Sequence, residues 1–258
     1  MDFMKLWCSS VKMWVKRWIL KESIPFDEKA FFENAVRHSR YNILKPLEDI
    51  MALRGLKILD IGCGYGGTIE ALKQKNQITG IEMNKDRASF AKSYFKDAKN
   101  VEIVNANIFK CHLKNNYYDL IIVSDVFEHI SDYENLMRMI SVGLKDKKGI
   151  AYISFTPYYG ANGGHIMLYI PIPYIYLVIP RKWICSLINR IGDFNSVLNR
   201  QFVINQFLAL NKLRITRFRE MVTQNKFIFI EEWSQKWLGT SYQYFCILRK
   251  SSTENNLW

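Results

Sequence analysis

The chain has 258 residues, a length that fits one large domain or one domain with a substantial insertion. Hydrophobic residues make up 49% and aromatic residues 14% of the sequence, which excludes an intrinsically disordered protein. The formal net charge of +12 favours an anionic partner, such as nucleic acid, an acidic membrane face or an anionic substrate, without choosing among them.

The cysteines and the apolar runs bear on the cellular compartment. The five cysteines are widely spaced, with no C-x-x-C pair and no zinc-ligand spacing, so we expect reduced thiols in a cytoplasmic protein. The longest uncharged apolar run, 166–180, is short for a bilayer span and is broken by prolines, so a membrane span is not expected. Lys12, Lys16 and Arg17 interrupt the N-terminal apolar pattern, which argues against a secretion signal. We therefore expect a cytoplasmic protein, with a peripheral location at the inner membrane face as the alternative.

The first twenty residues predict a basic amphipathic helix. Its apolar residues recur at spacings of three and four, and they are Phe3, Met4, Trp7, Val11, Trp14, Val15, Trp18 and Ile19. The stripe fits a helix packed on the protein's own core, and it also fits an anchor at a membrane surface, where tryptophan prefers the headgroup boundary. A second helical stretch, roughly 27–53, completes an N-terminal helical cap of residues 1–53.

Residues 54–157 alternate strands with helices. Strands are expected at 56–61, 77–81, 101–104, 119–124 and 149–154, and helices from the turn after the first strand to 74, at 86–96 and at 131–144. Strands and helices of this length that alternate imply a parallel sheet with right-handed crossovers. The fourth strand is almost entirely apolar, as a strand covered on both faces should be.

The regular alternation ends after the fifth strand. Residues 158–220 contain prolines, many aromatic residues and two basic helical stretches, around 183–190 and 201–219, so we expect an insertion that covers the substrate side. Residues 221–250 hold two closing strands, at 226–230 and 242–249, and residues 251–258 are a frayed tail. The predicted fold class is α/β: a Rossmann-like, mostly parallel seven-stranded sheet with helices on both faces and a helical, aromatic insertion after strand five.

A glycine-rich turn, Asp60-Ile-Gly-Cys-Gly-Tyr-Gly66, follows the first strand. Gly62, Gly64 and Gly66 let the backbone turn sharply and let a ligand lie directly against the main chain. The turn alone could equally hold the pyrophosphate of a dinucleotide, so residues elsewhere must decide between the two kinds of ligand.

Polar side chains at the ends of three strands distinguish between the two kinds of ligand. Asp60 ends the first strand, where its carboxylate can receive a substrate ammonium that a dinucleotide lacks. Glu82 ends the second strand, where two carboxylate oxygens can accept hydrogen bonds from both ribose hydroxyls. Asn107 follows the third strand, where its amide can meet the polar edge of adenine. Together these residues predict a site for adenosine with an amino-acid tail.

On these motifs, residues 38–155 resemble the class I S-adenosylmethionine-dependent methyltransferases, whose first motif Lys57-Ile-Leu-Asp-Ile-Gly-Cys-Gly-Tyr-Gly66 matches closely. The resemblance implies that Asp60 and Gly62 border the methionine part and that Asn107 with Ile108 flanks adenine. The full set of implied cofactor contacts is Asp60, Gly62, Gly64, Glu82, Met83, Asn107, Ile108 and Ser124. Asn107 departs from the family, which usually has aspartate there, and this puts the affinity in question more than the identity of the cofactor.

Candidate bases for the methyl acceptor follow the fourth and fifth strands. Asp125, His129 and His165 are the expected catalytic residues, because a histidine with a pKa near neutral suits the proton of a hydroxyl. Alternatively, Asp125, Glu128, His129 and His165 resemble the divalent-metal site of the ubiquinone-pathway O-methyltransferases and of the small-RNA 3′-terminal 2′-O-methyltransferases. A bound ion such as Mg²⁺ would lower the pKa of an acceptor hydroxyl. Asp125 stands where those families have glutamate.

The expected function is methyl transfer from S-adenosylmethionine to a hydroxyl of a small-molecule, glycan or lipid-linked acceptor. The segment 163–180 resembles methyltransferases of polysaccharide and lipid-linked glycan pathways. The alternatives are an RNA methyltransferase, which the lysines and arginines of 181–219 favour, a metal-assisted O-methyltransferase, and a non-catalytic cofactor-binding module. The expected partners are the acceptor and a membrane surface, ahead of nucleic acid.

Overall fold

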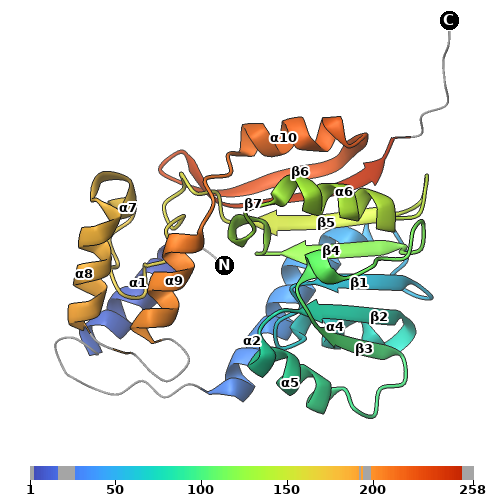
Figure 1. The fold of residues 1–258 in the computed structure, drawn as a ribbon, viewed down its shortest axis with the longest axis horizontal. Coiled ribbons are helices and arrows are strands. Elements are labelled where there is room, and N and C mark those ends of the chain that lie inside the picture. Colours follow the sequence, from blue (N-terminus) through green and yellow to red (C-terminus); the bar gives the residue numbers. More distant parts are fainter. Residues whose placement is uncertain (1–2, 17–26, 192, 194–198, 252–258) are drawn as a thin grey trace, which may run out of the picture.

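A seven-stranded sheet forms the centre of the computed structural model, which describes residues 3–16, 27–191, 193 and 199–251 (Figure 1). The strands are β1 (Lys57–Ile61), β2 (Gln77–Glu82), β3 (Val101–Asn105), β4 (Leu120–Ser124), β5 (Ile150–Phe155), β6 (Phe227–Trp237) and β7 (Thr240–Lys250), in the order β3-β2-β1-β4-β5-β7-β6. The first five strands pair in parallel, and β7 lies antiparallel between β5 and β6. The predicted Rossmann-like α/β fold is confirmed.

Helices cover both faces of this sheet. They are α2 (Glu28–Ser39), α3 (Lys45–Glu48), α4 (Gly67–Leu72), α5 (Lys85–Tyr94), α6 (Tyr133–Gly143) and α10 (Ile215–Gln224). Ile58 of β1 packs in one core cluster with Ile69 of α4. Its neighbour Leu59 packs in the other cluster, with Ile140 of α6 and Phe218 of α10. Successive strand residues point to opposite faces, so the central strands β1, β4 and β5 are buried on both sides, whereas β3 at the edge has no fully buried residue.

The predicted helical stretch 27–53 is a helix with an irregular centre. Asp27 caps α2 by accepting a hydrogen bond from the Ala30 N–H at 2.9 Å. After α2 the chain continues through a π-helical turn, Arg40–Leu44, into α3. The helix lies against α4, where a Cβ at Gly67 would come within 2.7 Å of the Ala35 Cβ. The cap therefore packs against α4, the helix that begins directly after the turn following β1.

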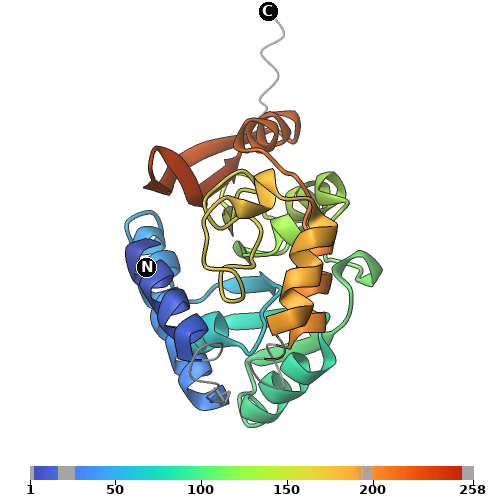
Figure 2. The same cartoon turned by 90° about the vertical axis from the view of Figure 1, so that its left-hand side faces the viewer.

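A second group of helices lies beyond the carboxyl ends of the parallel strands (Figures 1 and 2). It contains α1 (Phe3–Trp14), α7 (Ile175–Val178), α8 (Arg181–Ile191) and α9 (Arg200–Ala209), and it has its own apolar cluster. Met13 of α1 packs against that cluster, and the Trp7 indole donates a hydrogen bond to the Pro171 carbonyl at 2.8 Å. The described part of α1 thus packs on the insertion. Trp18 and Ile19 of the predicted helix lie outside the described residues.

The helical stretch expected at 201–219 is two helices with different locations. Leu210 leaves the helical conformation, with φ −57° and ψ 125°. The Asn211 amide then donates to the carbonyls of Phe127 and Ile130, at 2.6 and 2.7 Å, which ties the chain to the segment after β4. The following helix, α10, packs on the sheet core. The boundary expected at residue 220 therefore falls inside a helix that packs on the sheet core.

The two closing strands are longer than the apolar patterns indicated. Leu238 and Gly239 join them with φ values of 46° and 80°, a pair of positive values that is typical of a two-residue hairpin turn. The strands continue through charged residues such as Glu231 because one face of β6 is open to water. In the described part of the chain, no helix has both the length and the apolar content needed to cross a membrane. The tail beyond residue 251 lies outside that part.

Candidate functional site

The turn after β1 has the backbone conformation that glycine favours. The φ values are 76° at Gly62, 56° at Gly64 and 90° at Gly66. A Cβ at Gly62 would lie 2.4 Å from Cγ2 of Val126, whereas a Cβ at Gly64 would meet nothing within 4 Å. The turn is therefore tightly packed at its first glycine and open above the second, where a ligand could lie on the main chain.

Glu82, at the end of β2, holds this turn in place. Its two carboxylate oxygens accept hydrogen bonds from the main-chain N–H groups of Gly64 and Asn84, at 2.9 and 2.7 Å. The Asn105 amide donates to the carbonyls of Glu82 and Met83, at 2.9 and 3.1 Å, and fixes the end of β2 to β3. Each Glu82 oxygen can accept more than one hydrogen bond, so the carboxylate can still receive the hydroxyls of a ribose.

Asp60 is a buried carboxyl group without enough partners. Its side chain is 3% exposed, and Oδ2 has no hydrogen-bond partner among the described residues. Burial, and then the nearby Glu82 carboxylate, raise the pKa of Asp60 to about 7. A buried, unpartnered carboxyl is unfavourable in the protein alone, and an ammonium group from a ligand would supply the missing partner.

The residues predicted to flank adenine follow the ends of β2 and β3. Asn107 caps a short 3₁₀ turn, Ile108–Lys110, by accepting a hydrogen bond from the Phe109 N–H at 2.9 Å. Ile108 is buried, while Met83, across from it at the end of β2, is 69% exposed. Asn107 thus has a structural role that the sequence did not indicate, and its contact with adenine stays a prediction.

Ser124 and Asp125 end β4 in a network that reaches the last strand. The hydroxyls of Ser124 and Ser154 are 2.9 Å apart, and the Asp125 N–H donates to the Ser154 carbonyl at 2.9 Å. Asp125 has φ 56°, a left-handed conformation that is uncommon outside glycine. The Gln243 amide of β7 donates to Asp125 Oδ1 at 2.6 Å. The Gln243 hydrogen bond and the His38 imidazole both favour the charged form of Asp125 and act to lower its pKa.

Glu128, His129 and His165 meet beside this network. One ligand atom from each lies within 4.8 Å of the other two. The His165 Nε2 is 3.9 Å from Glu128 Oε1, which also accepts the Thr156 N–H at 3.0 Å, and the two imidazole ring centroids are 5.0 Å apart. Asp125 is not part of this cluster, so the structure brings together three of the four residues predicted to bind a metal.

The electrostatics of the cluster keep both imidazoles neutral, so the pKa near neutral that the sequence suggested for these histidines is wrong. Burial lowers the pKa of both imidazoles, to about 4 for His129, where Arg87 adds to the effect, and to about 3 for His165. Burial, and then the Asp125 carboxylate, raise the pKa of Glu128 well above its ordinary value. Glu128 Oε2 and His129 Nδ1 have no hydrogen-bond partner within the described part of the chain. Two neutral imidazoles and a buried carboxyl with free acceptor atoms fit the donor set of a divalent cation.

Four residues of this region were not predicted from the sequence. They are His38 of α2, Ser154 and Thr156 at the end of β5, and Gln243 of β7. The Thr156 hydroxyl donates to Gln243 Oε1 at 2.8 Å, which joins the two strand ends. A polar glutamine within the apolar run Tyr242-Gln-Tyr-Phe-Cys was the available sign for Gln243. His38 had no comparable sign, because the fold alone brings α2 to the end of β4.

One guanidinium lies between the glycine turn and the insertion. The Arg87 guanidinium of α5 lies over the ring of Tyr65 in the glycine turn, at 5.9 Å, and over the ring of Phe202 in α9, at 5.8 Å. Arg87 also acts electrostatically on His129. A single guanidinium therefore connects the glycine turn, the insertion and the histidine cluster.

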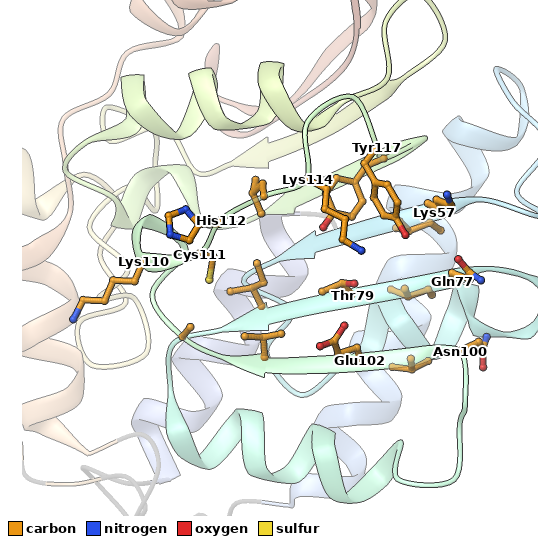
Figure 3. Close-up of a pocket in the computed structure, with 18 of the residues that line it drawn as sticks. Lys57, Gln77, Thr79, Asn100, Glu102, Lys110, Cys111, His112, Lys114 and Tyr117 are labelled. Atoms are coloured by element: carbon orange, nitrogen blue, oxygen red, sulfur yellow. The ribbon is translucent and has the colours of Figure 1, made fainter.

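A separate groove of about 750 Å³ lies along one face of β1, β2 and β3 (Figure 3). The connection from β3 to β4 contains only the 3₁₀ turn Ile108–Lys110, so on this face no helix of the described residues covers β2 and β3 as α6 and α10 cover β4 and β5. Lys57 and Lys114 lie over the ring of Tyr117, at 4.3 and 4.6 Å. Lys99 and Lys110 also line the groove, and Glu102 is its one acidic residue.

The strand order with its antiparallel β7, together with the glycine turn after β1, defines the class I S-adenosylmethionine-dependent methyltransferase fold. Residues 59–152 match the family model described as a methyltransferase domain. These residues are therefore a methyltransferase domain of the S-adenosylmethionine-dependent family. Membership of this family implies S-adenosylmethionine as the methyl donor, and the unpartnered Asp60 and the open space over Gly64 fit it.

Curated relatives of parts of the chain have different acceptors. An N-methyltransferase of Papaver somniferum is 27% identical over 38% of this chain and 30% of its own length. An uncharacterized RNA methyltransferase of Protochlamydia amoebophila is 34% identical over 51% of this chain and 31% of its length. A ubiquinone biosynthesis O-methyltransferase of Pelagibacter ubique is 28% identical over 46% of this chain and 51% of its length. The chain thus spans about half the length of these relatives or less.

Solved structures agree on the fold. An S-adenosylmethionine-dependent methyltransferase from Mesorhizobium loti has a TM-score of 0.57 at 14% identity, covering 80% of this chain and 96% of that chain. Magnesium protoporphyrin IX methyltransferase from Synechocystis, with bound S-adenosylhomocysteine, has a TM-score of 0.55 at 13% identity, covering 94% of this chain and 95% of that chain. At such identities these likenesses establish the fold alone.

Proposed function

We propose that the protein transfers a methyl group from S-adenosylmethionine to a hydroxyl of a small-molecule, glycan or lipid-linked acceptor. The observation that carries this proposal is the cluster of Glu128, His129 and His165 at the carboxyl edge of the sheet. Methyl transfer to a hydroxyl needs a group that accepts the proton, and His129 Nδ1 is a buried acceptor without a partner in the described residues. The cluster lies at the ends of β4 and β5, next to the strand that carries the cofactor turn.

The chain's own residues would hold the donor and align it. Asp60 would receive the ammonium of the methionine part, Glu82 the ribose hydroxyls, and Asn107 with Ile108 would flank adenine. S-adenosylmethionine, when bound, supplies an electrophilic methyl group on a sulfonium, so alignment of donor and acceptor is most of what the protein must do. Ser124 and Asp125 end the strand that points between the two ligands. The Gln243 hydrogen bond would keep the Asp125 carboxylate in one orientation.

The insertion supports an acceptor with an apolar part. Its cluster includes Tyr158, Tyr169 and Tyr176, all buried, together with Ile166, which follows His165 in the chain. The cysteines are free thiols, which supports a cytoplasmic location. A hydroxyl on a lipid-linked or glycan acceptor at the inner membrane face would suit both features.

A metal-assisted route is the second candidate, and the donor set favours it. Glu128, His129 and His165 would hold the ion, without Asp125. A divalent cation such as Mg²⁺ would lower the pKa of an acceptor hydroxyl there. An RNA acceptor is the third candidate, which the groove lysines Lys57, Lys99, Lys110 and Lys114 favour. It predicts tight, salt-sensitive binding to generic RNA.

The test has a binding stage and a transfer stage. Calorimetry should show saturable binding of S-adenosylhomocysteine and none of NAD, and Glu82→Ala should abolish it. Labelled donor is then offered with lipid, sugar, quinone and RNA fractions, with and without a chelator. Label in a hydroxyl-bearing lipid or sugar fraction supports the proposal, label in RNA replaces it with the RNA candidate, and binding without transfer to any fraction supports a non-catalytic cofactor-binding module.

A matched pair of histidine variants tests the role of the cluster. His165→Gln should lower methyl transfer while S-adenosylhomocysteine still binds. His112→Gln is the control, because it changes a histidine that lines the separate groove along β1 to β3. It should leave methyl transfer unchanged. Equal activity in both variants would remove the cluster from the proposed mechanism.

A further inference from the structure

Large apolar side chains on α7 and α8 are exposed to water. Val178 is 76% exposed and Trp183 is 64% exposed. Ile172, Leu177 and Leu187, which lie within the same fifteen residues or so of sequence, are also exposed. We call these five residues the α7–α8 surface. Several large exposed apolar side chains within one short segment indicate an interaction site.

The α7–α8 surface is not the packing face of its helix. Ile184, Ile188 and Ile191 of α8 are buried in the cluster of the insertion. Trp183 and Leu187 are four residues apart and therefore lie one above the other on a different face. The helix consequently has two apolar faces, of which the protein itself covers one.

The charges of this segment are positive up to Asp193, which lies beyond the end of α8 and pairs with Arg200 at 3.7 Å. Residues 166–192 contain Arg181, Lys182 and Arg190 and no aspartate or glutamate. Arg181 is engaged within the protein, where it donates to the Leu208 carbonyl and lies over the rings of Tyr158 and Phe207. Lys182 and Arg190 are exposed and form no ion pair with any residue that the structure describes. Exposed tryptophan and aliphatic side chains with cations and no acids are the composition of a surface that lies on anionic lipid.

The position of the α7–α8 surface suits such contact. In Figure 1, α7 and α8 are the elements farthest from the sheet, and Figure 2 looks directly at that side of the molecule. The insertion that carries them also carries His165 at its beginning. A bilayer in contact with α7 and α8 would therefore face the insertion and not the sheet.

We propose that the α7–α8 surface docks on an anionic phospholipid bilayer. This differs from an anchor formed by α1, whose Trp7 and Met13 contact the insertion. Where the acceptor is concerned, the inference rests on the proposed function, because docking through the insertion would bring the site to lipid-linked hydroxyls. The docking itself depends only on the exposed residues.

The experiment measures partition of the full chain onto vesicles. Vesicles of phosphatidylcholine with phosphatidylglycerol should bind the protein, and vesicles of phosphatidylcholine alone should bind it less. The double variant Val178→Ser/Trp183→Ser should lower the partition coefficient roughly tenfold. Lys182→Ala/Arg190→Ala should lower it roughly tenfold or more on anionic vesicles, since each cation near such a surface contributes roughly fivefold.

Matched variants keep the test specific. Val142→Ser changes an exposed valine on α6, and Lys75→Ala/Lys148→Ala removes two exposed lysines away from the insertion; neither should alter partition. Parent and Val178→Ser/Trp183→Ser that partition equally would overturn the proposal. A second result would also overturn it. If the parent is dimeric by light scattering, the double variant is monomeric and neither protein binds either kind of vesicle, then a second copy of the chain covers this surface. Binding of S-adenosylhomocysteine, measured in parallel, reports separately on the proposed function.

Discussion

Asp60→Asn is expected to make the cofactor-free protein less sensitive to rising pH while it abolishes binding of the methyl donor. The folded-state pKa of Asp60 is about 7, against an ordinary value of 3.8, because the group is buried beside Glu82. A carboxyl whose pKa is raised by folding stabilises the fold fully below its unfolded pKa. That contribution is lost as the pH rises from about 4 through about 7. The parent protein therefore loses stability over the same pH range in which Asp60 becomes charged and able to bind an ammonium group.

The size of the effect follows from the two pKa values. The whole difference between about 7 and 3.8 is worth ~4 kcal/mol, of which ~2–3 kcal/mol falls between pH 5 and pH 8. Asparagine has no such titration. Its own fit in the buried position adds a constant that does not depend on pH. The free energy of unfolding of Asp60→Asn relative to the parent should therefore increase by ~2–3 kcal/mol from pH 5 to pH 8.

Urea unfolding at several pH values measures this increase, and calorimetry with S-adenosylhomocysteine measures the loss of binding. Asp97→Asn, at an exposed position on the turn after α5, is the control and should follow the parent at every pH. A parallel pH dependence for Asp60→Asn and the parent would refute the assignment of Asp60 as a strained, ligand-receiving carboxyl. Tight binding by Asp60→Asn would refute its contact with the ammonium.

Four further substitutions, and removal of divalent metal, test other parts of the protein. Gly64→Ala should destabilise by only ~1 kcal/mol from its positive φ, yet weaken S-adenosylhomocysteine binding ~10-fold or more, because its Cβ would fill the open space over the turn. Gly62→Ala should also lose ~1–3 kcal/mol of stability in urea melts, because its Cβ would meet Val126; equal destabilisation by the two variants would contradict this packing. Glu128→Gln should lower methyl transfer by ~10²–10⁴-fold with binding of S-adenosylhomocysteine retained. Loss of the parent's activity on chelation, restored by Mg²⁺, would assign the cluster to metal binding, and indifference to the chelator would assign it to proton transfer. Trp7→Phe removes the donor to the Pro171 carbonyl and should lower the Tm by ~2–4 °C, whereas the exposed Trp183→Phe should not change it.

The central sheet and its cofactor side could be predicted from local sequence patterns. The five parallel strands each form a short apolar run, and glycines at alternate positions indicate the turn after β1. Glu82 and Asn107 could be located because each directly follows such a strand. These features depend on residues close together in the sequence, where strand ends and turns have clear chemical signs.

The parts that could not be predicted depend on contacts between distant segments. Asn211 interrupts the expected helix because its side chain bonds to carbonyls more than eighty residues earlier in the chain. The hairpin at Leu238 and Gly239 was missed because leucine is an unusual residue for its position. His38 lies near Asp125 only because α2 packs beside α4, and no local pattern indicates this. Asp125 was grouped with a metal site by spacing, whereas the hydrogen bond from Gln243 turns it toward β7.

The antiparallel strand β7 has a consequence for how the protein is made. β7 is inserted between β5 and β6, so β5 has an unpaired edge until residues 240–250 have been synthesised. The residue that orients Asp125, Gln243, is in that strand. During translation, β1 to β5 and the glycine turn can fold as soon as they emerge. The region around Asp125 is complete only after β7 has been synthesised. A nascent chain arrested before residue 240 should therefore have an exposed strand edge for chaperones to bind, and the methyl donor would have no completed acceptor site beside it.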